Sequence, residues 1–158
     1  MVAGRGTATI TGVGTQHFVF YPSSGGLQLL GIDTTNVNAG VALQQSGGPF
    51  SNASVSGNYT LNFTGNNSSG EVDAIAQFNA SGSGTLTGAL DLNNAGVTSG
   101  NLALTGTYTV ASSGRGTATL NSSAGPVNIV FYLASGSRAV FIESDGFQVS
   151  VGTFIKQP

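Results

Sequence analysis

One stretch of this sequence occurs twice, and the repetition limits the folds that the chain can adopt. The residues Gly-Arg-Gly-Thr-Ala-Thr stand at 4–9 and again at 114–119, and each copy is followed by an aromatic segment that ends in Phe-Tyr. Further residues match in the same order, namely Asp33 and Asp145, Gly40 and Gly152, and Gln45 and Gln157. A module of about 45 residues has room for roughly four strands at the usual spacing of about 8–12 residues per strand. The sequence therefore predicts two copies of a four-stranded unit.

The apolar pattern along the chain is typical of β-strands. No segment carries apolar residues at i, i+3 and i+4 over three turns, and glycine, at 25 of 158 residues, is too frequent for helices. Segments such as 59–63 and 71–78 instead alternate apolar and polar residues. We expect an all-β protein in which consecutive strands from Tyr59 to Lys156 form an antiparallel meander of eight. Such a meander most naturally closes into an up-and-down β-barrel, because closure removes both exposed edges, and a sandwich is the alternative.

The predicted strands divide the chain into three parts. Residues 1–45 form a half-module of four strands that copies 114–157, and residues 58–158 form a complete eight-stranded barrel module. Residues 46–57 are rich in Ser and Gly, a composition typical of a linker. The half-module matches only the last four strands of the barrel, so we expect it to lack its other half.

Charge and cysteine content exclude several classes of function. Charged residues make up only 6% of the chain, and four basic residues cannot form a stripe that holds a phosphate backbone, so we expect no nucleic-acid partner. The absence of cysteine excludes disulfides, thiolate zinc sites and cysteine nucleophiles. The chain shows neither the pattern of an export signal nor a run of about 18 apolar residues, so we expect no membrane insertion. We interpret it as a piece of a larger secreted protein or as a truncated reading frame, with the export signal elsewhere.

Three motifs carry a resemblance to known proteins: the Gly-Arg-Gly-Thr-x-Thr strand, the Phe-Tyr strand and the ending Gly-Thr-Phe-Ile-Lys-Gln at 152–157. With these motifs the chain resembles the tandem Gly/Thr/Asn-rich β-repeat modules of very large secreted or surface proteins of environmental bacteria. The resemblance implies an extracellular or cell-surface location and gives these motifs a structural role. The predicted topology also resembles the lipocalin and streptavidin barrels, although the sequence contains no lipocalin motif, and topology alone says little about function.

His17 is the only histidine and the first candidate for catalysis. A two-histidine or three-histidine metal site is excluded within one chain, and the second copy carries Asn128 at the matching position. One interpretation is a structural histidine at the end of an aromatic strand. The other is a general base, which would need a carboxylate to orient it.

The acidic residues offer candidates for that carboxylate. Glu71 and Asp73 are two residues apart on a predicted strand and therefore share a face, where they either bind a cation, carry out acid–base chemistry or simply form a polar outer surface. Asp33 and Asp145 occupy the same predicted loop in the two copies, where aspartate ordinarily serves turn chemistry. We expect Glu143, at a strand end, to be exposed.

Two arginines recur between glycines, and two tyrosines recur in the aromatic strand. In one interpretation, Arg5 and Arg115 place a charge inside the barrel, where the arginines and the tyrosines Tyr21 and Tyr132 would bind a ligand carboxylate. In the other, the arginines cap the barrel end by donating to backbone carbonyls. The Phe-Tyr strand of each copy is apolar on both faces, which predicts that its outer side is covered by a ligand, a neighbouring module or another subunit.

The half-module predicts a partner. Four strands alone expose two edges and an aromatic face, and two copies related by a two-fold axis would complete an eight-stranded barrel. We therefore expect a homodimer through residues 1–45, together with flanking modules of the parent protein. The expected interface residues are Phe18, Phe20, Tyr21, Leu27 and Leu29.

Three functions remain open at this point. The first is a non-catalytic structural or adhesive module of a surface protein. The second is a small-molecule-binding barrel that uses Arg115 and Tyr132. The third is a weak hydrolase of esters or phosphoesters that uses His17 with Glu71 or Asp73, with or without a metal. The sequence indicates no organic cofactor.

Overall fold

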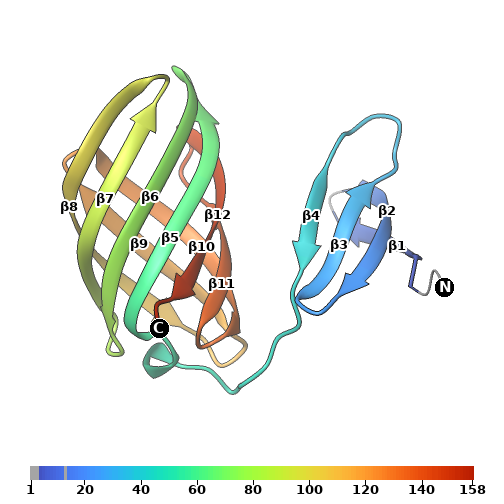
Figure 1. The fold of residues 1–158 in the computed structure, drawn as a ribbon, viewed down its shortest axis with the longest axis horizontal. Helices are drawn as coiled ribbons and strands as arrows, with labels where there is room; N and C mark the ends of the chain where they lie inside the picture. Colours follow the sequence, from blue (N-terminus) through green and yellow to red (C-terminus); the bar gives the residue numbers. More distant parts are fainter. Residues whose placement is uncertain (1–3, 13) are drawn as a thin grey trace. The chain divides into compact units, whose positions relative to one another are not determined.

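The computed structural model describes residues 4–12 and 14–158, which form two compact units, Met1–Gln44 and Gln45–Pro158 (Figure 1). The predicted fold class is confirmed: the described residues form an all-β protein with a closed eight-stranded antiparallel barrel and a separate four-stranded antiparallel sheet. None of the described residues belongs to a helix that is long and apolar enough to cross a membrane.

The barrel is a meander in which every strand pairs with its neighbours in the sequence, and the last strand pairs with the first. The closed order is β10-β11-β12-β5-β6-β7-β8-β9. Its strands are β5 Ser56–Asn67, β6 Gly70–Ser81, β7 Thr85–Asn94, β8 Val97–Val110, β9 Arg115–Ser122, β10 Gly125–Ser135, β11 Arg138–Glu143 and β12 Gln148–Lys156. Closure is made by β12 and β5, which pair over nine residues from Gln148↔Asn67 to Lys156↔Tyr59.

The alternation in the sequence determines which side chains enter the barrel. Along β6, Val72, Ala74, Ala76, Phe78 and Ala80 are buried, and the residues between them are exposed. This period of two is the direct result of the pleat, which points successive side chains to opposite faces.

An aromatic cluster fills one part of the barrel. The rings of Tyr59 and Phe78 are stacked with their centroids 5.4 Å apart, and Phe154 and Phe131 meet in an edge-to-face contact at the same separation. Offset and edge-to-face geometries are the favourable ones for aromatic pairs, so this cluster stabilises the barrel beyond its buried area.

The segment from Gln45 to Val55 closes one end of the barrel, although its composition predicted a linker. Phe50 and Val55 are buried in the barrel core, and η1 (Asn52–Ser54) lies between them. The hydroxyl of Tyr108 donates to the carbonyl of Val55 at 2.6 Å and accepts the N–H of Gly82 at 2.9 Å. The side chain of Gln45 donates to the carbonyls of Ser113 and Leu133.

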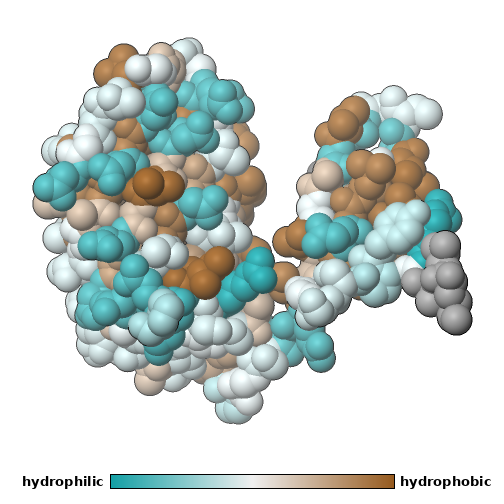
Figure 2. All heavy atoms as spheres, viewed as in Figure 1, coloured by the Kyte–Doolittle hydropathy of each residue, from teal (hydrophilic) through white to brown (hydrophobic). Residues whose placement is uncertain are grey.

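The small unit is an open sheet with the order β1-β2-β3-β4. Its strands are β1 Gly6–Gly12, β2 Gly14–Ser23, β3 Gly26–Gly31 and β4 Ala39–Ala42. Figure 2 shows apolar side chains gathered on this sheet. Because so few strands enclose no interior, its apolar residues are mostly exposed or only partly buried, and Val19 is the one large described side chain in it that is buried.

Candidate functional site

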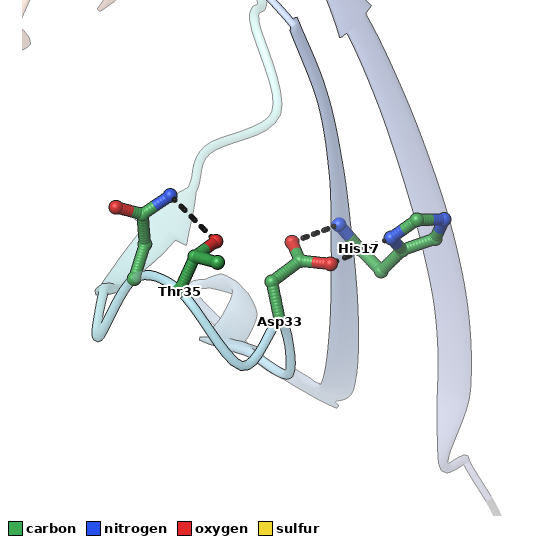
Figure 3. A network of polar contacts seen from close by, with 4 residues as sticks. His17, Asp33 and Thr35 are labelled. Atoms are coloured by element: carbon green, nitrogen blue, oxygen red, sulfur yellow. Dashed lines mark hydrogen bonds and ion pairs between the residues drawn. The ribbon is translucent and has the colours of Figure 1, made fainter.

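His17 lies on β2 and contacts the carboxylate of Asp33, which belongs to the loop between β3 and β4 (Figure 3). Nδ1 of His17 is 2.7 Å from Oδ1 of Asp33, and the backbone N–H of His17 donates to Oδ2 at 2.8 Å. The imidazole is 51% exposed and the carboxylate 26%. A histidine held by a carboxylate is one arrangement that a general base uses, so this pair is the strongest catalytic candidate among the described residues.

The two donors on His17 change the acidity of Asp33. The backbone N–H of His17, and after it the imidazole, stabilise the carboxylate and lower the pKa of Asp33 below its ordinary value. Asp33 is therefore ionised at neutral pH and can accept both hydrogen bonds at once.

The second copy makes the same contacts without a histidine. The backbone N–H of Asn128 donates to Oδ2 of Asp145 at 2.6 Å, and its side-chain amide donates to Oδ1 at 2.7 Å. The carbonyls of His17 and Asn128 also accept equivalent backbone bonds, from Ile32 at 2.9 Å and from Ser144 at 2.8 Å. In both copies the aspartate thus ties the loop after the third strand to the second strand, and an amide does this as well as an imidazole. These bonds reach a residue 16 or 17 positions earlier in the chain and are not the local turn bonds expected of Asp33 and Asp145.

Glu71 and Asp73 lie on the outer face of β6, where both side chains are exposed. They belong to the unit Gln45–Pro158, whereas His17 belongs to Met1–Gln44, and the carboxylate that His17 contacts is Asp33. Across the part of the chain that the structure describes, no group of three or more His, Asp or Glu side chains is arranged to hold a metal ion. Glu71 and Asp73 therefore belong to the polar outer face of β6.

The recurring arginines and tyrosines also point outward. Arg115 begins β9, and Tyr132 lies opposite it on β10; both are exposed because Gly116 and Phe131, their neighbours, occupy the inward positions. Arg5 and Tyr21 are likewise exposed in the small unit. The hypothesis of a ligand carboxylate inside the barrel required these side chains to face inward, and they do not.

The capping role expected for Arg115 is carried by other residues. No hydrogen bond of its guanidinium occurs among those of the described residues, whereas Gln45, Phe50 and Tyr108 close this end of the barrel with their hydrogen bonds and buried rings. The sequence signal for this closure was the pair of apolar residues Phe50 and Val55 within an otherwise polar segment.

A cavity of about 280 Å³ occupies the other end of the barrel. Its wall is formed mainly by inward apolar side chains, and the turn between β9 and β10 lies at its rim. The lining includes Leu61, Phe63, Leu90, Leu104, Leu120 and Val127. This volume is near the lower end of the range for pockets that enclose small organic ligands, about 300–1,000 Å³. The barrel is therefore packed with side chains at one end and hollow at the other.

Glu143, expected at the surface, is 6% exposed and points into the barrel from β11. It lies in phase with Ala139 and Phe141, so the alternation of the strand already placed it inward, and the expectation of exposure was wrong. Its Oε2 accepts hydrogen bonds from the amide of Gln148 and the hydroxyl of Ser150, both at 2.5 Å, and its Oε1 is buried without a partner. Gln148 also lines the cavity, so this buried carboxylate is linked to the cavity wall.

The outer surface of the barrel carries an apolar ladder across three strands. Val130, Ile142 and Val151 are neighbours in register on β10, β11 and β12, and Ile142 and Val151 are exposed. In the small unit the equivalent ladder consists of Val19, Leu30 and Ala39. The covering that the sequence predicted for these strands stays a prediction.

No protein-family model, curated protein or solved structure matches this chain. The functional proposal accordingly rests on the residues and contacts of the chain itself.

Proposed function

We propose that this chain is a non-catalytic structural repeat module of a larger secreted or cell-surface bacterial protein. The observation that carries the proposal is the recurrence of the His17–Asp33 contact as Asn128–Asp145. A catalytic histidine cannot be exchanged for an asparagine, whereas a residue that ties a loop to a strand can, because the amide supplies the same donor. The polar but nearly uncharged composition is in keeping with a module of this kind.

The exchange His17→Asn tests the proposal, because the second copy already shows that asparagine fits this position. We expect the variant to fold with unchanged stability. Hydrolysis of a nitrophenyl ester and of a nitrophenyl phosphate should equal the buffer rate for both proteins, with and without a chelator. A hydrolysis rate above buffer that His17→Asn abolishes would replace this proposal with a hydrolase.

The cavity supports a second candidate function, the binding of a small apolar molecule. A partly open cavity of about 280 Å³ lined mainly by apolar side chains favours a neutral ligand that buries apolar surface. The test is titration with the neutral fluorophore N-phenyl-1-naphthylamine, comparing the wild type with Ala76→Leu, which places three extra carbon atoms in the lining. Loss of saturable binding in this variant, but not in the outward-facing control Gln77→Ala, would support a ligand site. No saturable binding in the wild type would leave the barrel a scaffold.

A further inference from the structure

The small sheet has two open edges at the positions where the barrel has none. Among the described residues, β1 pairs only with β2, and β4 pairs only with β3. At the matching positions of the barrel, β9 pairs also with β8, from Val110↔Gly116 to Thr105↔Asn121, and β12 pairs also with β5. Open edges present rows of unpaired backbone N–H and C=O groups that favour the addition of further strands.

The four strands of the small sheet are built like those of the barrel. Gly6 lies opposite Phe20 just as Gly116 lies opposite Phe131, and a methyl group on either glycine would overlap the ring of that phenylalanine. In both copies, therefore, the ring of a phenylalanine occupies the space beside a glycine of the neighbouring strand. The small sheet accordingly has the internal strand pairing of half a barrel and repeats its glycine–phenylalanine contact between the first two strands.

The inner face of the small sheet is less buried than its counterpart. Phe18, Phe20 and Leu29 are half-buried, whereas Ile129, Phe131 and Phe141, at the matching positions, are all buried in the barrel. The difference arises because β5 to β8 cover the barrel positions, while among the described residues nothing equivalent covers the small sheet. Tyr21, which the sequence placed with this face, lies on the opposite one, since its neighbours Phe20 and Pro22 alternate with it.

We propose that the β1–β4 sheet of a second copy of this chain supplies the missing strands, so that two small sheets close into one eight-stranded barrel. This inference rests on the proposed structural role of the four-stranded unit and adds its partner.

Strand direction allows this closure. Consecutive strands are antiparallel, so β1 and β4 run in opposite directions. A two-fold axis along the barrel axis keeps every strand direction, and β4 of one copy therefore meets β1 of the other in an antiparallel pair, twice over. Such an isologous contact makes a closed dimer instead of a fibre.

The chemistry of the inner face favours a copy of itself as the occupant. The inward positions of the four strands carry no charged side chain, so two copies meet without like-charge repulsion. The eight-stranded barrel of the same chain, all of whose residues the structure describes, is already closed and has no edge to offer.

The first test measures the mass of the full chain by light scattering at micromolar concentration. We expect twice the chain mass of 15.7 kDa for the wild type. Ala8→Lys should shift the protein to monomer, because Ala8 lies on the inner face and a closed barrel would bury the ammonium group. Thr9→Lys, the next residue on the outer face, should remain a dimer. A monomeric wild type, or species larger than a dimer, would overturn the proposal.

A second test remains valid even if Ala8→Lys fails to fold. The chain has no cysteine, so pairs of cysteines can be introduced at outward positions of β1 (Thr7 or Thr9) and β4 (Ala39 or Val41). Within one copy these edges are separated by three strand spacings, roughly 14 Å, which is beyond the reach of a disulfide. We expect at least one of the four double variants to form a disulfide-linked dimer on mild oxidation, in at least tenfold higher yield than Thr9→Cys/Gln77→Cys. Equal yields would show that contact is collisional and that the edges do not pair.

The two proposals fail separately. Hydrolysis lost in His17→Asn would remove the structural role and leave the mass of the protein unchanged. A monomeric wild type without hydrolytic activity would remove only the second copy as partner, and would point to a different four-stranded unit.

Discussion

At the scale of single residues, the contact between a glycine and a phenylalanine on neighbouring strands is the feature that both units share most closely. The ring of Phe131 lies over Gly116, and that of Phe20 lies over Gly6. The ring takes the space that a side chain on the glycine would fill, so the two residues act as one packing unit. This gives a reason for the second glycine of the Gly-Arg-Gly motif that the sequence did not reveal.

Gly116→Ala tests this packing unit. The added methyl group would overlap the Phe131 ring and approach the carbonyl of Thr109, and overpacking of this kind typically costs about 1–3 kcal/mol. We expect the barrel to lose that amount in denaturant unfolding. Thr117→Ala, next along β9 and exposed, should change stability by no more than about 0.5 kcal/mol. Equal effects of the two substitutions would show that the ring moves away without cost.

The Asp33 carboxyl gives a prediction about pH. Its pKa is lowered in the folded protein, first by the backbone N–H of His17 and then by the imidazole, so the ionised form is favoured by folding. The resulting stability is fully present above the unfolded pKa of about 3.9 and is lost as the pH falls through the lower folded pKa. An NMR titration of the side-chain carboxyl carbon should give a value below 3.9.

His17→Asn is the matched control for that titration. The backbone donor stays and the amide replaces the imidazole as second donor, as at Asn128, so the pKa of Asp33 should remain lowered. A return of this pKa to about 3.9 would show that the imidazole, and not the backbone, is responsible.

At the scale of elements, the segment from Gln45 to Val55 packs against the barrel, although its composition is typical of a linker. It contributes buried side chains to the barrel and is held by Asn52, whose Oδ1 accepts the N–H of Val110 at 2.8 Å, and by the hydroxyl of Tyr108. A segment whose only regular secondary structure is the short helix η1 therefore closes the barrel end. Composition reports the polarity of such a segment and not the few apolar residues that determine where it packs.

Tyr108→Phe tests how firmly this closure is held. Removal of the hydroxyl leaves the carbonyl of Val55 and the N–H of Gly82 without their partner at a part-buried site, which costs about 1–3 kcal/mol. We expect that loss in thermal unfolding, together with faster hydrogen exchange at Gly82. Tyr132→Phe, which removes an exposed hydroxyl, should leave both unchanged. An unchanged exchange rate at Gly82 in Tyr108→Phe would contradict the role assigned to the hydroxyl.

At the scale of the whole molecule, the barrel contains a complete set of paired strands and its own core, whereas the small sheet does not. The two units should therefore respond differently to separation. The barrel pairs all of its strand edges and buries its apolar face within Gln45–Pro158, whereas among the described residues of the small unit the two edge strands each have one partner.

Deletion of residues 1–44 tests this difference. Gln45 must be kept, because its amide donates to two carbonyls of the barrel. We expect the shortened chain to be a monomer by light scattering, to show a β-type circular dichroism spectrum with almost no helix, and to unfold at the temperature of the barrel in the full chain. A shortened chain that still dimerises would place the interface on the barrel instead of the small sheet.

The sequence by itself determined the all-β class, the eight-strand meander and the equivalence of the two four-stranded units. These follow from local rules. The alternation in 71–78 indicates which side of a strand is buried, and the repeated motif indicates that two segments share one pattern of strands. The same alternation also placed Glu143 inward, and the expectation of exposure came from giving its charge more weight than its position on the strand.

Only the tertiary structure decided which distant residues meet. It joined His17 to Asp33, turned Arg115 and Tyr132 outward, and packed Phe50 into the barrel end. Each of these contacts depends on the register between strands or on the path of a loop, and a shift of one residue in register would reverse every inward and outward position. Such long-range geometry leaves almost no trace in the neighbouring residues of the sequence, because it is determined by the closure of the whole sheet.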